Sequence, residues 1–129
     1  MAAAQAERPL AGPLLVAISV IHLACTPVFY GSGLAKIIDD GVLDAVESGS
    51  SLLDARAATF WYVVAGFGMG LLGYLAWWVE RRVGVLPGAL GWLLVVFTVI
   101  DVLLMPLSGF WLFLAPAALV IKRSRHHDG

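Results

Sequence analysis

The segment Trp92-Leu-Leu-Val-Val-Phe-Thr-Val-Ile-Asp101-Val-Leu-Leu-Met105 decides the class of this protein, because it is almost entirely apolar and yet contains an aspartate. Asp101 is the one ionisable side chain in this run. A long apolar run is typical of a helix inside a bilayer, where a carboxyl group costs about 3 kcal/mol or more. We therefore expect Asp101 to face protein or water and to have either a partner or a task.

The composition of the whole chain supports the same reading. Of its 129 residues, 60% are hydrophobic and 13% are charged, whereas soluble domains carry about 25% charged residues. These values predict one integral membrane domain, residues 1–129. The net charge of −1 gives no basic field that would attract nucleic acid. Cys25 is the only cysteine, which excludes an intrachain disulfide, a CxxC redox centre and a thiolate metal cluster, and we predict no metal or other cofactor.

Four apolar segments predict the fold. They run over about residues 10–33, 57–79, 86–105 and 107–121. A spanning helix needs about 20 mostly apolar residues, so only the last segment is short. The prediction is an all-α fold, a four-helix transmembrane bundle in the cytoplasmic (inner) membrane.

The basic residues set the predicted orientation, because cytoplasmic loops carry an excess of lysine and arginine. Two basic residues, Lys36 and Arg56, fall on one side of a four-span arrangement. Six fall on the other: Arg8, Arg81, Arg82, Lys122, Arg123 and Arg125. Both termini are therefore expected in the cytoplasm.

The segment 36–56 is then the one sizeable outer loop, between the first two helices. It carries five acidic residues: Asp39, Asp40, Asp44, Glu47 and Asp54. Its apolar residues recur roughly at helical spacing, which predicts an amphipathic helix over the bundle mouth, followed by a hinge at Ser48-Gly49-Ser50-Ser51. A solvated acidic loop is the simpler reading, and a lid or a cation-attracting vestibule is the functional one.

A second polar residue lies at a depth similar to that of Asp101. At 1.5 Å per residue, His22 lies about 18 Å along the first helix, and Asp101 about 22 Å along the third. Both helices run in the same direction, so a contact between the two side chains is geometrically allowed. His22 shares a polar helix face with Ser19, Cys25 and Thr26, and Thr98 shares one with Asp101.

Two readings of a His22–Asp101 pair stay open. The pair either joins two helices or, as two neutral groups, works as an acid and a base. Two prolines favour a pocket beside it, because Pro27 loosens the first helix and Pro106 ends the third. Gly66 and Gly70 form a GxxxG pattern that permits close helix packing.

Three parts of the chain resemble an uncharacterised family of small four-helix bacterial membrane proteins. They are His22 in the first span, the segment Phe60-Trp61-Tyr62-Val-Val-Ala65-Gly66, and the segment Met105-Pro106-Leu107-Ser108-Gly109-Phe110-Trp111. The resemblance implies a four-helix fold and a bacterial origin, and it brings no activity. The chain is more loosely similar to DoxX-like proteins and to the sterol-isomerase-like membrane fold, in which buried acids and aromatic side chains surround a lipophilic substrate.

The sequence therefore predicts a membrane pocket for a hydrophobic small molecule. Asp101 is the expected acid and His22 its base or hydrogen-bond partner, in an isomerisation, a cyclisation or an epoxide opening. The expected pocket lining is Thr26, Tyr30, Trp61, Thr98 and Trp111. The alternatives are a small proton-coupled exporter and a structural subunit of a membrane complex. Its expected partners are the lipid bilayer and, given the small size and the glycine face, further copies of the chain.

Overall fold

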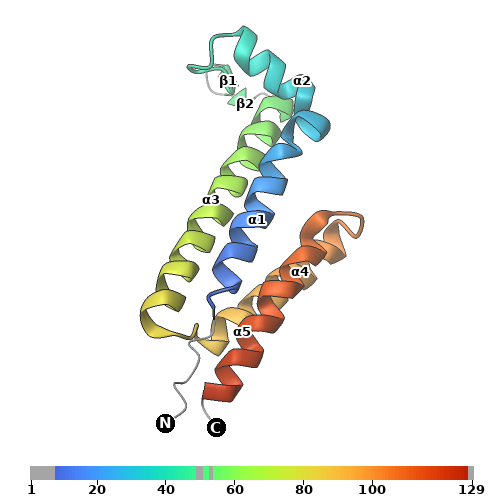
Figure 1. The fold of residues 1–129 in the computed structure, drawn as a ribbon. Helices are drawn as coiled ribbons and strands as arrows, with labels where there is room; N and C mark the ends of the chain where they lie inside the picture. Colours follow the sequence, from blue (N-terminus) through green and yellow to red (C-terminus); the bar gives the residue numbers. More distant parts are fainter. Residues whose placement is uncertain (1–7, 49–50, 53, 128–129) are drawn as a thin grey trace. The chain divides into compact units, whose positions relative to one another are not determined.

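The structure is a computed structural model that describes residues 8–48, 51–52 and 54–127 (Figure 1). The described elements are α1 (Ala11–Ala24), α2 (Thr26–Asp39), β1 (Glu47–Ser48), β2 (Ser51–Leu52), α3 (Asp54–Val83), α4 (Gly88–Leu104), the 3₁₀ helix η1 (Gly109–Phe113) and α5 (Leu114–His127). The two short strands form an antiparallel hairpin, and the other elements are helical. The predicted all-α class is thus confirmed.

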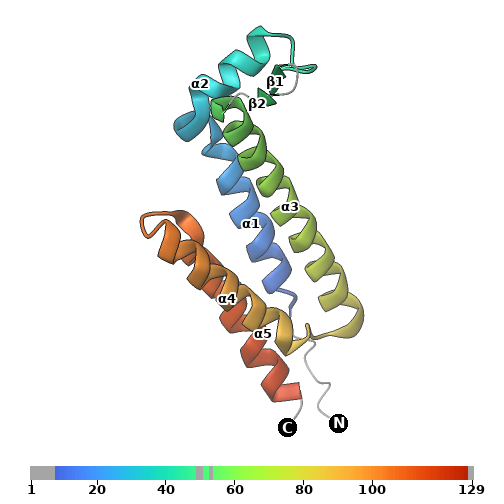
Figure 2. The same ribbon diagram turned by 180° about the vertical axis from the view of Figure 1, so that it is seen from behind.

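The chain divides into two compact units. The first contains the described residues up to Ile18 and from Gly70 onward, and the second contains residues 19–69. In the first unit, α4 and α5 lie side by side in both views (Figures 1 and 2). Gly91 permits this contact, because a Cβ atom there would lie 2.6 Å from the Ile121 side chain. The core of this unit includes Leu15, Phe113 and Val120.

The first predicted span, residues 10–33, is not one straight helix. α1 ends at Ala24, α2 begins at Thr26, and the two helices are bent by 52°. Pro27 explains the break, since its nitrogen cannot donate a hydrogen bond to the Leu23 carbonyl and its ring crowds that carbonyl. The bend lies within the second unit.

The predicted amphipathic helix across the acidic loop is wrong beyond Asp39. α2 ends in a Schellman turn, in which Gly41 N donates to Ile38 O at 3.0 Å and Val42 N donates to Ile37 O at 2.9 Å. Gly41 has a φ of +84°, which glycine adopts without steric cost. The hairpin of β1 and β2 follows, with Glu47 opposite Leu52. Gly49 and Ser50, at the centre of the predicted hinge, lie outside the described residues.

The second and third predicted spans match helices. α3 contains the whole of 57–79, and α4 covers most of 86–105. α4 stops at Leu104, because the α-helical conformation is disfavoured for Met105 before Pro106.

The fourth apolar segment, residues 107–121, is not one α-helix. A turn leads into η1, and α5 starts only at Leu114 and continues to His127. Pro116 has no N–H to donate to the Leu112 carbonyl, so an uninterrupted α-helix through both residues would lose a bond there. The helix also continues past Ile121, because lysine and arginine are good helix formers.

The membrane candidates are fewer than the sequence predicts. Among the described helices, α3 is long and apolar enough to span by itself, and α1 with α2 qualifies as a bent pair. α4 is apolar but has 17 residues. One or two candidate spans are therefore established by length and composition, and the four-span bundle is a proposal.

Candidate functional site

Asp101 lies one turn before the end of α4 and is half-buried. Its Oδ2 atom is buried and has no hydrogen-bond partner among the described residues. Its backbone carbonyl accepts a hydrogen bond from Met105 N at 2.7 Å, which closes the last turn of the helix. A buried carboxyl oxygen without a partner is costly, so the position calls for a functional or structural explanation.

The surroundings of Asp101 along the chain are aromatic. Phe97, one turn earlier on the same helix face, meets the rings of Phe110 and Phe113 edge to face at 5.7 and 5.5 Å between centroids. Thr98 is buried, but its hydroxyl donates to Leu94 O at 2.7 Å in its own helix. Ser108 Oγ, in the turn after α4, is a second buried atom without a partner in the described chain.

His22 lies in the second unit and packs against α3. Its Nε2 atom lies 2.9 Å from the carbonyl oxygen of Tyr62, and the two rings stack at 3.8 Å between centroids. A carbonyl oxygen can only accept, so Nε2 carries the proton and, in the neutral ring, Nδ1 stays available as an acceptor. Tyr30 packs against Tyr62, with 4.7 Å between the two ring centroids. The sequence did not indicate Tyr62 as the partner of His22.

Glycine makes this contact between α1 and α3 close. A Cβ atom at Gly66 would lie 2.5 Å from Leu23 and 3.0 Å from His22. Ser19 adds a hydrogen bond, since its hydroxyl donates to Gly66 O at 2.7 Å. In the first unit, Gly73 packs equally closely against Val16. Gly66 and Gly73 therefore serve contacts within the chain, and these two residues do not argue for a homo-oligomer, which stays a prediction.

The two residues of the predicted pair lie in different units, His22 in the second and Asp101 in the first. Its contact therefore stays a prediction. Thr26, Tyr30 and Trp61 also lie in the second unit, and Thr98 and Trp111 in the first.

The predicted lining residues differ in their free polar groups. Thr26 Oγ1 is buried and has no partner in the described part of the chain. Trp111 is exposed and its indole N–H donates to Pro106 O at 3.0 Å. Trp61 is exposed and meets Phe60 edge to face at 5.3 Å. Of these three residues, Thr26 offers the clearest unused group to a ligand.

Two open pockets lie in the first unit. One, of about 360 Å³, is lined by Pro13, Val16, Ala17, Tyr74 and Trp77 and is almost wholly apolar. The other is lined partly by basic residues of α5. Neither of these two is lined by Asp101 or by the predicted ligand-binding residues, although the apolar pocket is of a size that small ligands use.

A buried ionic cluster at the end of α3 escaped the sequence analysis. Both carboxylate oxygens of Glu80 accept backbone hydrogen bonds, from Ala11 N at 3.3 Å and from Gly12 N at 2.9 Å. Arg123 donates to the same carboxylate at 3.3 Å. Glu80 thus caps the positive end of α1 and pairs with a cation of α5. The sequence did not indicate Glu80 as a buried residue, because the residues that it contacts are 43 to 69 positions away.

Comparisons with known proteins assign no function. No curated protein matches the chain, and no solved structure matches it. The likeness to DoxX-like proteins therefore rests on the sequence pattern alone. A family model matches residues 6–127, which is nearly the whole chain, so the protein belongs to the family described as "Family of unknown function (DUF6463)".

Proposed function

We propose that this protein is a multi-pass membrane protein that holds a hydrophobic small molecule, and that Asp101 acts on this molecule as an acid. The observation that carries the proposal is the buried Oδ2 atom of Asp101, which has no partner among the described residues. A ligand oxygen in hydrogen-bond contact with that carboxyl group would remove the cost of leaving it unpaired.

The exposed apolar surface supports the membrane part of the proposal. Only 17% of an 18-residue apolar stretch of α3 is buried, whereas the core helix of a soluble protein is mostly buried. Large side chains such as Leu71 and Leu103 are 72% and 78% exposed. Hydrocarbon is the surrounding that such helices need. The protein should stay in the membrane pellet after extraction with alkaline carbonate, and release into the supernatant would contradict insertion.

His22 is the proposed base. Its Nε2–H is held by the Tyr62 carbonyl, and the stack with Tyr62 fixes the ring plane. This arrangement leaves Nδ1 as the proton acceptor and fixes the tautomer, as a base needs. The proposal requires His22 and Asp101 to reach the same ligand.

Acid–base chemistry on a lipophilic substrate follows from these two groups. Asp101 would give a proton to a carbonyl, alkene or epoxide, and His22 would take one from carbon or from an attacking hydroxyl. The substrate gains one proton and loses one, so an isomerisation, a cyclisation, or an epoxide opening by a hydroxyl of the same substrate needs no further reactant. A proton then returns from His22 to Asp101 to restore the starting state. Thr26, Tyr30, Trp61, Thr98 and Trp111 are the proposed lining.

The test compares three full-length proteins purified in mild detergent: the wild type, Asp101→Asn and Asp39→Asn. Asp39 is exposed at the end of α2, so its substitution is a matched control for the loss of one carboxyl group. Bound lipophilic molecules are extracted and compared by mass spectrometry. We expect one compound in the wild type and in the control that is absent or chemically altered in Asp101→Asn. The same extract from all three proteins would contradict the proposal.

The same variants separate the alternative functions. A proton-coupled exporter would lose efflux of a toxic compound in Asp101→Asn cells, without a change in the bound molecule. A structural subunit would lose a stable partner complex instead. His22→Phe keeps an aromatic ring against Tyr62 but removes the base, so it should keep the bound compound and abolish its conversion.

A further inference from the structure

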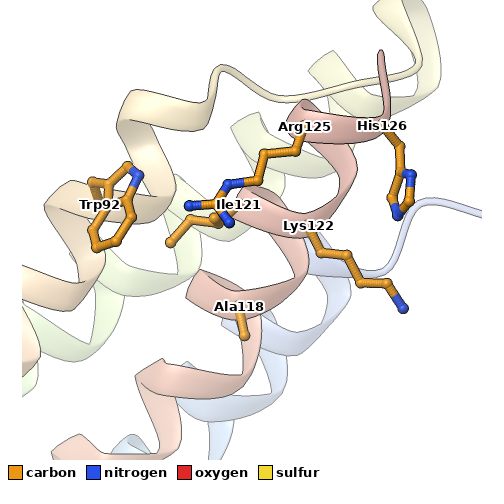
Figure 3. A pocket seen from close by; sticks show the side chains of 6 residues that line it. All are labelled: Trp92, Ala118, Ile121, Lys122, Arg125 and His126. Atoms are coloured by element: carbon orange, nitrogen blue, oxygen red, sulfur yellow. The ribbon is translucent and has the colours of Figure 1, made fainter. Parts of the chain in front are cut away.

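A basic pocket lies at the end of the hairpin formed by α4 and α5. It is open, has a volume of about 610 Å³, and is lined by Trp92, Ala118, Ile121, Lys122, Arg125 and His126. Figure 3 shows Trp92 on α4 across from Ile121 and Arg125 of α5, with Lys122 and His126 farther round the same helix. Arg125 thus extends on the same side of α5 as Ile121, toward Trp92, whereas Lys122 and His126 extend from another side of the helix.

Close packing builds this pocket. A Cβ atom at Gly91 would lie 2.6 Å from Ile121, and one at Gly88 would lie 2.6 Å from the Ser124 hydroxyl. These two glycines bring the first turns of α4 against the last turns of α5. As a result, Trp92 lies across from the basic end of α5.

The cations of the pocket are available to a ligand. Lys122, Arg125 and His126 are exposed, and within the described residues Lys122 and Arg125 form no salt bridge. Lys122 and His126, four residues apart, share one face of α5, and Arg125 extends toward Trp92 and Ile121 (Figure 3). Arg123, on another face, is the basic residue that pairs with Glu80. The positive charges of Lys122 and Arg125 thus flank the apolar side chains Trp92, Ala118 and Ile121.

We propose that this pocket binds an anionic phospholipid, with the headgroup phosphate held by Lys122 and Arg125 and the first acyl carbons on Trp92, Ala118 and Ile121. Tryptophan and basic side chains both favour the level of the lipid headgroups, and the six-to-two distribution of basic residues predicts that this end faces the cytoplasmic leaflet. The apolar floor distinguishes a lipid from a free anion, which would leave it unoccupied. The proposal rests on membrane insertion but not on the chemistry of Asp101.

The test uses the full chain in detergent micelles, titrated with phosphatidylglycerol or with phosphatidylcholine of the same acyl chains and followed by native mass spectrometry. Lys122→Gln with Arg125→Gln should weaken phosphatidylglycerol binding about tenfold or more and should weaken phosphatidylcholine binding much less, because the choline cation already offsets the charge of its phosphate. The matched control is Arg81→Gln with Arg82→Gln, which removes the same charge from guanidinium groups that lie over Trp77 and Trp78. This control should keep the phosphatidylglycerol affinity.

Three outcomes would overturn the proposal: equal losses in the two double variants, no preference for phosphatidylglycerol in the wild type, or displacement of the lipid by glycerol phosphate at similar concentration. The last would assign the pocket to a free anion. Carbonate extraction of the same proteins tests membrane insertion separately. A protein that stays in the membrane but does not prefer phosphatidylglycerol would contradict the lipid site alone.

Discussion

Arg123 of α5 reaches Glu80 of α3 at 3.3 Å, and the same carboxylate caps the first turn of α1. The Glu80 side chain is 3% exposed, and that of Arg123 is 15% exposed. One acidic side chain therefore joins three helices of the first unit. A buried carboxylate needs this number of partners, because its desolvation is offset only by good hydrogen bonds.

Removal of the Glu80 carboxylate should destabilise the first unit strongly. Glu80→Ala leaves Arg123 without this partner and uncaps α1, and breaking a buried pair typically costs about 3–5 kcal/mol. Glu80→Gln keeps an acceptor for one backbone N–H and should lose less. Thermal unfolding in detergent measures both variants, with the exposed Asp39→Asn as the control. Equal melting temperatures for Glu80→Ala and the control would contradict the structure.

Gly66 and Gly68, two residues apart in α3, should respond oppositely to alanine. A Cβ atom at Gly66 would overlap Leu23 and press on His22, so Gly66→Ala should cost about 1–3 kcal/mol. Apart from its neighbours in its own helix, no described atom lies within 4 Å of a Cβ at Gly68, so Gly68→Ala should gain up to about 1 kcal/mol from helix propensity. Thermal unfolding of the two variants provides the comparison. A smaller loss at Gly66 than at Gly68 would show that α1 does not pack there.

Single cysteines should report the membrane topology in a Cys25→Ser background. Asp44→Cys and Leu107→Cys should react with a membrane-impermeant maleimide from outside, and His127→Cys only in inverted vesicles. Leu107 is fully exposed in the turn between α4 and η1, so the protein does not shield a cysteine there from the maleimide, and only the membrane can. If Leu107→Cys reacts from neither side, the α4–α5 hairpin is re-entrant and the four-span arrangement is wrong.

Two of the four apolar runs, residues 57–79 and 86–105, predicted single helices well, because a run of about 20 apolar residues is typical of a helix. The ends of the helices were harder to predict from the sequence. Pro27 signals a loosened helix, but the sequence alone does not show that the chain bends by 52° there. Gly41 could have located the end of α2, since glycine after a helix favours a Schellman turn. The apolar spacing beyond it favoured a longer helix instead.

The candidate site could also be predicted only in part. Asp101 and His22 stand out in the sequence because each is a polar group in an apolar run. Their neighbours do not stand out. A backbone carbonyl, such as that of Tyr62 beside His22, cannot be identified as a partner from the pattern of side chains. The partners of Glu80 depend on packing between segments that are distant in the sequence.

Carbodiimide labelling of Asp101 tests the central claim most directly. A proton donor must carry its proton in the resting protein, and dicyclohexylcarbodiimide, which dissolves in the bilayer, reacts with protonated carboxyl groups. A water-soluble carbodiimide, used in parallel, reaches the exposed loop acids Asp39, Asp40 and Asp44. Peptide mass spectrometry of the protein in membranes should find the hydrophobic adduct on Asp101 and the water-soluble adduct only on the loop acids. No hydrophobic adduct on Asp101, or equal labelling of Asp101 and the loop by the water-soluble reagent, would contradict its role as an intramembrane acid.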